Sequence, residues 1–350
     1  MIDLIETRRP AIPSTTEPGW SELCAVLEDV LPSTAADDGA IELEQLKTRV
    51  YRLRIGSNGT ARSFVLKRYD PWLARRNELV VQCWLPALGL ADRSPRLLAT
   101  AAERRGRWVW HAYEDLGNGA LDPTHTDPGR VEAVVDLLAE LHTGAIGHAI
   151  VPQCRHYCGN LGAPFFVANV RDAIALLESL APPHLEPTPD QGELRGRLLG
   201  RLYRLRDEMP QRVQMLETLG GPDTLLHGDL WTTNALVADT PDGPTARLID
   251  WDHVAVGPVS YDLSTFLYRF AKADRPWILD AYRRAVGRAG WHLPAAQDLN
   301  ALFETAEYAR YANRIIWPAV ALLEERAAWG FEQLAEVERW FDALNPALPD

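Results

Sequence analysis

The chain of 350 residues contains little lysine, little cysteine and no long apolar run. Only three of its 36 basic residues are lysines, at positions 47, 67 and 272. Four cysteines are too few for the disulfide framework of a secreted protein in a chain this long. No apolar stretch reaches the roughly 18 to 20 residues that a membrane span needs, and the N-terminus lacks the apolar core of a signal peptide. We therefore expect a cytoplasmic protein with no membrane partner.

The formal net charge is −12. Proteins that bind nucleic acid usually carry a basic face, so no nucleic-acid partner is expected. The charge is compatible with a cationic or neutral substrate, although net charge acts mainly on solubility and steering. The segment "CRHYC" around His156 offers at most three metal ligands, so a structural pair of thiols is favoured over a metal site.

The residue patterns divide the chain into three parts. Residues 1–18 are expected to be a mobile segment. Within residues 19–115, the segments "TRVYRLRI" and "SFVLKRY" alternate polar and apolar side chains around the turn signal Asn58-Gly59, and "ARRNELVVQCWLPAL" has a helical pattern. Together they predict a small sheet with one helix packed on it. Residues 116–350 predict mainly helices, apart from a hairpin near residues 235–250. The fold class is therefore α+β, with a small β-rich N-terminal lobe, a large helical C-terminal lobe and a cleft between them.

One long helix-forming stretch before this hairpin contains Pro210. Proline has no backbone N–H to donate, and its ring clashes with the preceding turn of a helix. We therefore expect Pro210 to interrupt the helix.

Two polar motifs lie at the ends of the predicted hairpin. The first, "HGDLWTTN", ends at Asn234, and the second, "LIDWD", contains Asp250. The hairpin would bring Asn234 and Asp250 side by side on one edge. Amide and carboxylate oxygens are hard ligands of the kind that magnesium prefers. Each residue alone could simply cap a turn, but the joint pattern favours a metal site near Asp229.

This pair of motifs resembles the catalytic loop and the metal-binding segment of protein-kinase-like enzymes. The closest resemblance is to the aminoglycoside phosphotransferase and choline kinase-like family, over about residues 45–270. It implies a small-molecule kinase that transfers the γ-phosphoryl group of ATP or GTP to a hydroxyl. Asp229 would be the catalytic base, and Asn234 and Asp250 would hold Mg²⁺. The implied structural supports of the loop are His227 and Asp262.

The N-terminal lobe should supply a cation for the phosphates. Lys67 lies on an apolar strand in the place of the kinase lysine, with Glu78 of the next helix as its candidate partner. Alternatively, Lys67 is a solvated strand residue and Glu78 pairs with Arg75. The first turn of the sheet has no G-x-G-x-x-G pattern, so Thr48 and nearby backbone amides are the candidate triphosphate contacts. Adenine is expected to bind backbone groups at the lobe connection, around Tyr113, Glu114 and Asp115.

The acceptor is expected to be a small molecule. Gly228 replaces the arginine with which regulated protein kinases hold an activation-loop phosphate, and no A-P-E segment follows Asp250. Asp252 could support the metal or simply occupy a turn, and the C-terminal helix face could be ordinary surface. The candidate substrate contacts are Asp252, His253, Glu304, Glu307, Tyr308 and Tyr311.

The resemblance leaves several activities open. An antibiotic, an amino sugar or a related metabolite is the implied acceptor. A sugar or fructosamine-type kinase is the alternative, and a non-catalytic nucleotide-binding pseudokinase is the rival from another class. The sequence does not identify the acceptor, the choice of nucleotide or the oligomeric state.

Overall fold

The computed structural model describes residues 15–30, 41–56 and 62–349. The turn signal Asn58-Gly59 and most of the expected mobile segment lie outside these residues. The predicted α+β class is confirmed, with strands concentrated in one part of the chain and helices in the other.

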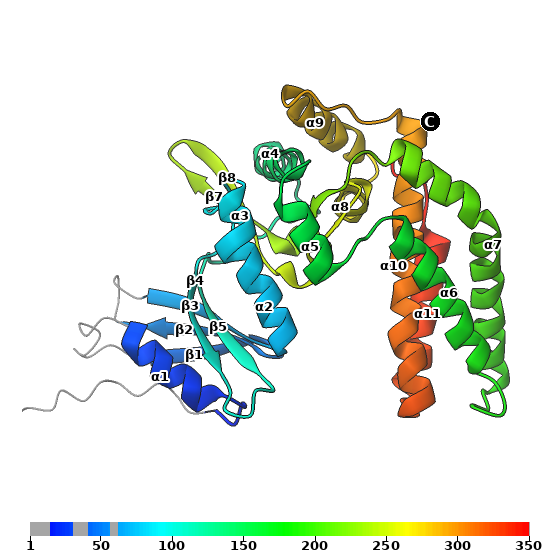
Figure 1. Cartoon of the computed structure of the whole chain (residues 1–350), viewed down its shortest axis with the longest axis horizontal. Coiled ribbons are helices and arrows are strands. Elements are labelled where there is room, and N and C mark those ends of the chain that lie inside the picture. Colours follow the sequence, from blue (N-terminus) through cyan, green and yellow to red (C-terminus); the bar gives the residue numbers. More distant parts are fainter. Residues whose placement is uncertain (1–14, 31–40, 57–61, 350) are drawn as a thin grey trace, which may run out of the picture. The chain divides into compact units, whose positions relative to one another are not determined.

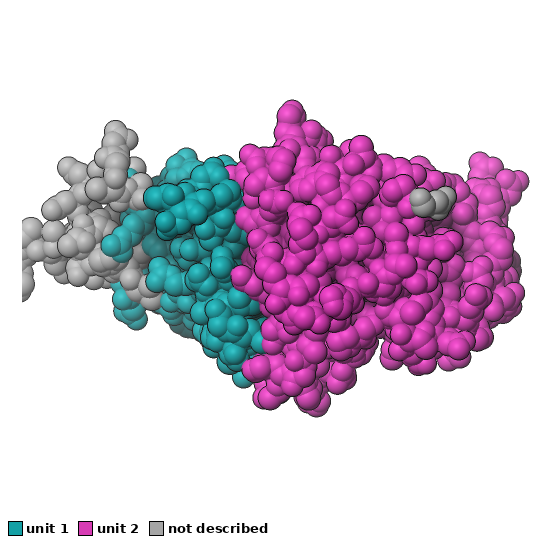
Figure 2. All heavy atoms as spheres, turned by 90° about the horizontal axis from the view of Figure 1, so that it is seen from above, with its two compact units in different colours: residues 1–120, 235–252 teal, residues 121–234, 253–350 magenta. Residues whose placement is uncertain are grey.

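The chain forms two compact units, coloured separately in Figure 2. The sequence patterns place the second predicted hairpin with the C-terminal lobe, whereas its contacts place it in the first unit. The lobe boundary expected near residue 116 remains a prediction. The first unit comprises residues 1–120 and 235–252, and the second comprises residues 121–234 and 253–350.

The first unit is built on a five-stranded antiparallel sheet with the strand order β1-β2-β3-β5-β4 (Figure 1). The pairing of β2 with β3 confirms the hairpin predicted there. Strand β4 was not predicted. The elements of this sheet unit are α1 (Trp20–Val30), β1 (Ile41–Lys47), β2 (Val50–Ile55), β3 (Arg62–Tyr69), α2 (Pro71–Leu79), a π-helical continuation η2 (Val80–Trp84), α3 (Leu85–Ala87), β4 (Leu97–Ala102) and β5 (Val109–Glu114).

Apolar side chains cover both faces of the sheet. Trp20, Leu23 and Leu27 of α1 pack on one face against strand residues such as Trp110. Ala74 of α2 packs on the other face. Because successive side chains of a strand alternate between faces, each position on β3 and β5 has a fixed side.

The predicted hairpin is formed by β7 (Ala235–Thr240) and β8 (Gly243–Leu248), which pair antiparallel. Its backbone joins the first unit through hydrogen bonds from Val237 N to Gly119 O, 2.8 Å, and from Leu248 N to Arg93 O, 2.9 Å. A Cβ atom at Gly119 would lie 2.5 Å from the Val237 carbonyl oxygen. Glycine is therefore required where the two segments meet.

The second unit is mainly helical (Figure 1). Within the described residues no single helix is both long and apolar enough to cross a membrane, although the bent pair of helices Pro128–Ala145 and Ile150–Cys158 meets that test by length and composition alone. Its elements are α4 (Pro128–Ala145), α5 (Ile150–Cys158), α6 (Ala163–Ser179), α7 (Pro189–Leu219), β6 (Thr224–Leu226), η3 (Thr232–Asn234), η4 (Trp251–His253, shared with the first unit), β9 (Ala255–Gly257), α8 (Ser260–Leu267), α9 (Arg275–Arg288), α10 (Ala296–Glu324) and α11 (Trp329–Ala343).

The core of this unit lies where α6, α7, α10 and α11 pack together. The expected interruption at Pro210 is wrong, because α7 continues through it to Leu219. Because Pro210 has no backbone N–H, the carbonyl of Arg206 has no helical donor. Both residues face solvent. The buried residues Leu205 and Met209 hold the opposite face of the helix in place.

Candidate active site

Lys67 lies on the face of the sheet that carries α2. Phe64 and Leu66 of β3 point into the core beneath α1, so the alternation of the strand turns Lys67 the other way. Lys67 is paired across the strands with His111 of β5. Its ammonium lies 4.6 Å from the ring centroid of Tyr69.

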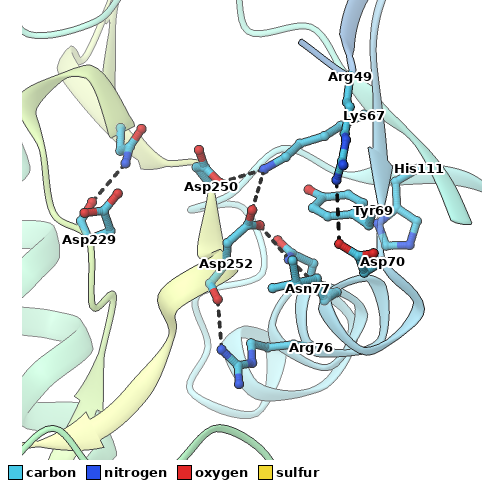
Figure 3. Close-up of polar contacts among 12 residues, drawn as sticks. Arg49, Lys67, Tyr69, Asp70, Arg76, Asn77, His111, Asp229, Asp250 and Asp252 are labelled. Atoms are coloured by element: carbon cyan, nitrogen blue, oxygen red, sulfur yellow. Dashed lines mark hydrogen bonds and ion pairs between the residues drawn. The ribbon is translucent and has the colours of Figure 1, made fainter. Parts of the chain in front are cut away.

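Two aspartates hold the Lys67 ammonium (Figure 3). Nζ lies 2.7 Å from Asp250 Oδ1 and 2.9 Å from Asp252 Oδ2. Burial lowers the pKa of Lys67, but the charges of Asp250 and Asp252 outweigh burial and leave the pKa above its usual value. Burial, together with the charge of Asp250, raises the pKa of the Asp252 carboxyl, although Lys67 opposes the shift. The pair therefore concentrates negative charge around a single cation.

Further polar contacts join the segment after β8 to helix α2 within the first unit (Figure 3). Asn77 Nδ2 donates to Asp252 Oδ1 at 3.0 Å, and Arg76 donates to the Asp252 carbonyl at 2.9 Å. Asp250 has a φ angle of 67°, which is unusual for a residue other than glycine. Because its side chain is only 22% exposed and makes these bonds, Asp252 is not the solvent-facing turn residue considered as an alternative.

Glu78 does not pair with Lys67 as expected. Among the described residues, Asp250 and Asp252 are the carboxylates paired with Lys67, and Glu78 contacts His111 and Arg75 instead. Glu78 Oε1 lies 3.3 Å from His111 Nε2. The two aspartates already neutralise the lysine, which leaves Glu78 to pair with the histidine of the neighbouring strand.

The turn expected to contact triphosphate consists of Thr48 and Arg49, between β1 and β2. Arg49 has a positive φ of 65°. Its guanidinium lies over the Trp108 ring at 4.5 Å and 3.6 Å from Asp70. The tight turn is thus made without glycine and is anchored by an arginine, and Thr48 is exposed beside it.

The side chains at the expected adenine site make contacts within the first unit. Tyr113 is buried, and its hydroxyl lies 2.8 Å from His111 Nδ1. Asp115 Oδ2 lies 2.7 Å from Arg52 Nε. Glu114 pairs with Arg247 at 3.2 Å. The adenine contact expected from the backbone of these residues remains a prediction.

In the second unit, Asp262 supports the loop that carries Asp229. The fully buried Asp262 carboxylate accepts hydrogen bonds from the backbone N–H groups of His227, 2.7 Å, and Gly228, 2.9 Å. Burial opposes ionisation of Asp262, but hydrogen bonding and charge from His142, with help from His227 and the Gly228 N–H, lower its pKa. The ionised carboxylate thereby sets the path of the loop.

The loop itself orients Asp229 and Asn234. Trp231 Nε1 donates to Asp229 Oδ1 at 2.8 Å. Asn234 Nδ2 donates to the Asp229 carbonyl at 2.9 Å, which leaves the amide oxygen of Asn234 as the group available to a ligand. The role of Trp231 was missed, although its place two residues after the aspartate in "HGDLW" was a usable signal.

Gly228 cannot be replaced without moving the loop. Its φ is 81°, and a Cβ atom would lie 1.8 Å from the His253 carbonyl oxygen. A side chain at this position, such as arginine, is therefore excluded on steric grounds. His253 approaches the loop through its backbone, while its side chain is exposed.

The candidate acceptor contacts on α10 separate into two groups. Glu307 is buried and pairs with Arg310, and Tyr311 packs edge-on against Phe341. Glu304 bonds Arg212 at 2.9 Å and lines a hollow of about 230 Å³. Other lining residues of the hollow are Tyr268, Asn300 and Asn345, and Tyr308 stacks on Phe341 and donates to Glu304.

The lysine-bearing sheet and the loop braced by Asp262 have the form of a protein-kinase-like phosphotransferase. A model of the phosphotransferase enzyme family matches residues 43–299, and the chain belongs to this family. It is a small-molecule kinase in the broad sense, a phosphotransferase with a hydroxyl acceptor.

Several solved structures have a similar fold. An ethanolamine kinase from Plasmodium vivax aligns with a TM-score of 0.60 and 12% identity, over 91% of this chain and 85% of that chain. The macrolide 2'-phosphotransferase MphH from Brachybacterium faecium gives 0.52 and 18%, over 86% and 92%. The aminoglycoside phosphotransferase APH(3'')-Id from Streptomyces rimosus, in complex with ADP and streptomycin, gives 0.50 and 18%, over 81% and 98%. No curated protein matches the chain significantly.

Proposed function

We propose that the protein transfers the γ-phosphoryl group of ATP or GTP to a hydroxyl of a small molecule, with Asp229 as the base. The observation that carries this proposal is the orientation of Asp229. One carboxylate oxygen accepts the Trp231 N–H, so the second oxygen is left to accept the proton of an acceptor hydroxyl. The ADP bound to the Streptomyces rimosus relative supports a nucleotide as donor.

The donor groups of the chain fit magnesium. Asn234 immediately precedes β7, and Asp250 follows β8 by two residues, so the pairing of these strands supports the two as joint ligands. Both offer hard oxygen atoms. Asp250 and Asp252 already hold one cation, the Lys67 ammonium. When bound, Mg²⁺ would neutralise charge on the nucleotide phosphates.

The remaining roles follow from charge and position. Lys67 would bind phosphate oxygen atoms while Asp250 and Asp252 keep its ammonium in place. Thr48 and the backbone around it remain the proposed triphosphate contact, and the backbone of residues 113–115 the proposed adenine contact. Asp262 and His227 fix the loop. An antibiotic, amino-sugar or metabolite acceptor and a cytoplasmic location stay proposals from the sequence.

Replacement of the base tests the proposal. Asp229→Asn should lower kcat by about 10²- to 10⁴-fold, because the amide cannot accept the hydroxyl proton. The affinity for nucleotide, measured by fluorescence titration, should stay within about threefold, since the base is not assigned to nucleotide binding. Asp242→Asn, on the exposed turn between β7 and β8, is the matched control and should leave both measurements unchanged. Undiminished turnover in Asp229→Asn would remove this residue from the mechanism.

A further inference from the structure

A guanidinium lies one indole ring away from the proposed base. Arg269 follows α8 by two residues, and its Cζ atom lies 4.0 Å from the centroid of the Trp231 ring. The same indole donates its N–H to Asp229 at 2.8 Å. Arg269 is therefore linked to Asp229 through the Trp231 ring, and the charge of Asp229 acts on it.

Arg269 has no acidic partner in the part of the chain that the structure describes. Its Nε is buried and makes no hydrogen bond. Burial lowers the pKa of Arg269, and the nearby Arg310 adds to this, although Glu307 and Asp229 oppose it. A partly buried guanidinium without a carboxylate costs free energy, and a bound anion would offset that cost.

Two nearby arginines of the second unit make ion pairs, whereas a second arginine after α8 does not. Arg310 pairs with Glu307, and Arg212 pairs with Glu304. By contrast, Arg275, six residues after Arg269, lies over the Tyr268 ring at 4.9 Å and has no ion pair among the described residues. Arg269 and Arg275 thus make no ion pair within the described residues, although the chain has a net charge of −12.

We propose that Arg269 binds an anionic group of the acceptor, a carboxylate or a phosphate monoester. A planar guanidinium can offer such a group two parallel hydrogen bonds. An acceptor with several ammonium groups would instead place like charges beside Arg269. The acceptor is then an acidic hydroxyl compound, such as a sugar acid or sugar phosphate, rather than a polycationic antibiotic. This inference rests on the proposed kinase function.

The test compares matched acceptors that differ in one anionic group: glucose with glucuronate, N-acetylglucosamine with N-acetylmuramate, and ribose with ribose 5-phosphate. Kanamycin represents the polycations. Phosphate transfer from ATP with Mg²⁺ is measured by mass spectrometry for the wild type, Arg269→Gln and Arg269→Lys. Arg284→Gln, an exposed arginine on α9, is the control and should behave as the wild type.

The wild type should prefer the acidic member of a pair at least tenfold in kcat/KM. Arg269→Gln should lower kcat/KM about 10- to 100-fold for that member and less than threefold for its neutral counterpart. For the acidic member, kcat/KM of Arg269→Lys should lie between the values of the wild type and of Arg269→Gln. Equal losses for both members would overturn the inference, because Arg269 would then act on the transferred phosphate or on the fold. Efficient transfer to kanamycin would also overturn it. Transfer to no hydroxyl compound at all would instead reject the proposed function.

Discussion

At the scale of single residues, Lys67 is identified by rarity and by position. A lysine kept on an apolar strand, in a chain that otherwise uses arginine, was a signal visible in the sequence, and the side chain bonds two aspartates. The partner of Glu78 was not visible, since it depends on the strand register that sets His111 opposite Lys67. Arg269 lies after a helix in a segment without periodic pattern, so nothing in the sequence marks its contact with Trp231.

Lys67→Arg should lower kcat by about 10- to 100-fold even though the positive charge is kept. The ammonium is a compact charge that meets two carboxylates at 2.7 and 2.9 Å, whereas a guanidinium is a wider planar fork. Steady-state kinetics with saturating acceptor would measure the loss. Lys47→Arg, exposed on β1, is the matched control. Normal kcat in Lys67→Arg would show that the shape of the cation does not matter there.

At the scale of elements, the hairpin of β7 and β8 was predicted, whereas its membership of the first unit was not. That membership rests on backbone contact at Gly119, which leaves no side-chain pattern. Strand β4 was missed because "LLATAA" has no β-branched residue except Thr100 and lies at the edge of the sheet. Helix α7 was predicted too short, because a solvent-facing proline is tolerated when the opposite face is buried.

Pro210→Ala should stabilise the protein by about 2 kcal/mol. Restoring the hydrogen bond to the Arg206 carbonyl and removing the ring clash should lower the free energy of the folded state by about 3 kcal/mol. The more flexible unfolded chain should offset up to about 1 kcal/mol of this gain. Urea unfolding followed by circular dichroism would measure the change. Pro189→Ala, at the first position of α7 after the Thr188 cap, should give no gain, because no N–H bond is missing there. An equal gain at both prolines would contradict this explanation.

At the scale of the whole molecule, stability should fall in mildly acidic solution because of His111. Burial lowers the pKa of this histidine to about 4, with a smaller contribution from Lys67 and against the opposing effect of Glu78. Its ordinary value is 6.5. Between these values the unfolded chain binds the proton more tightly, so the free energy of unfolding decreases as the pH falls from about 6.5 to about 4, by at most about 3 kcal/mol.

His111→Gln should remove most of this pH dependence, since the amide does not titrate. Urea unfolding at pH 7.0, 5.5 and 4.5 would reveal a flatter profile than that of the wild type. His125→Gln, whose side chain is 86% exposed, is the control and should keep the wild-type profile. A profile equally steep in His111→Gln and the wild type would assign the acid sensitivity to other groups.

The return of residues 235–252 to the first unit has a consequence for biosynthesis. The sheet is complete in sequence by residue 114, yet the hairpin whose backbone bonds Arg93 and Gly119 ends at residue 248, and the aspartates that bond Lys67 follow at 250 and 252. At about 5 to 20 residues per second, a ribosome needs roughly 7 to 28 s to make the intervening stretch. During that interval the backbone carbonyls of Arg93 and Gly119 lack their hairpin donors and Lys67 lacks its counter-ions, so we expect chaperones to bind the nascent chain at this stage of translation.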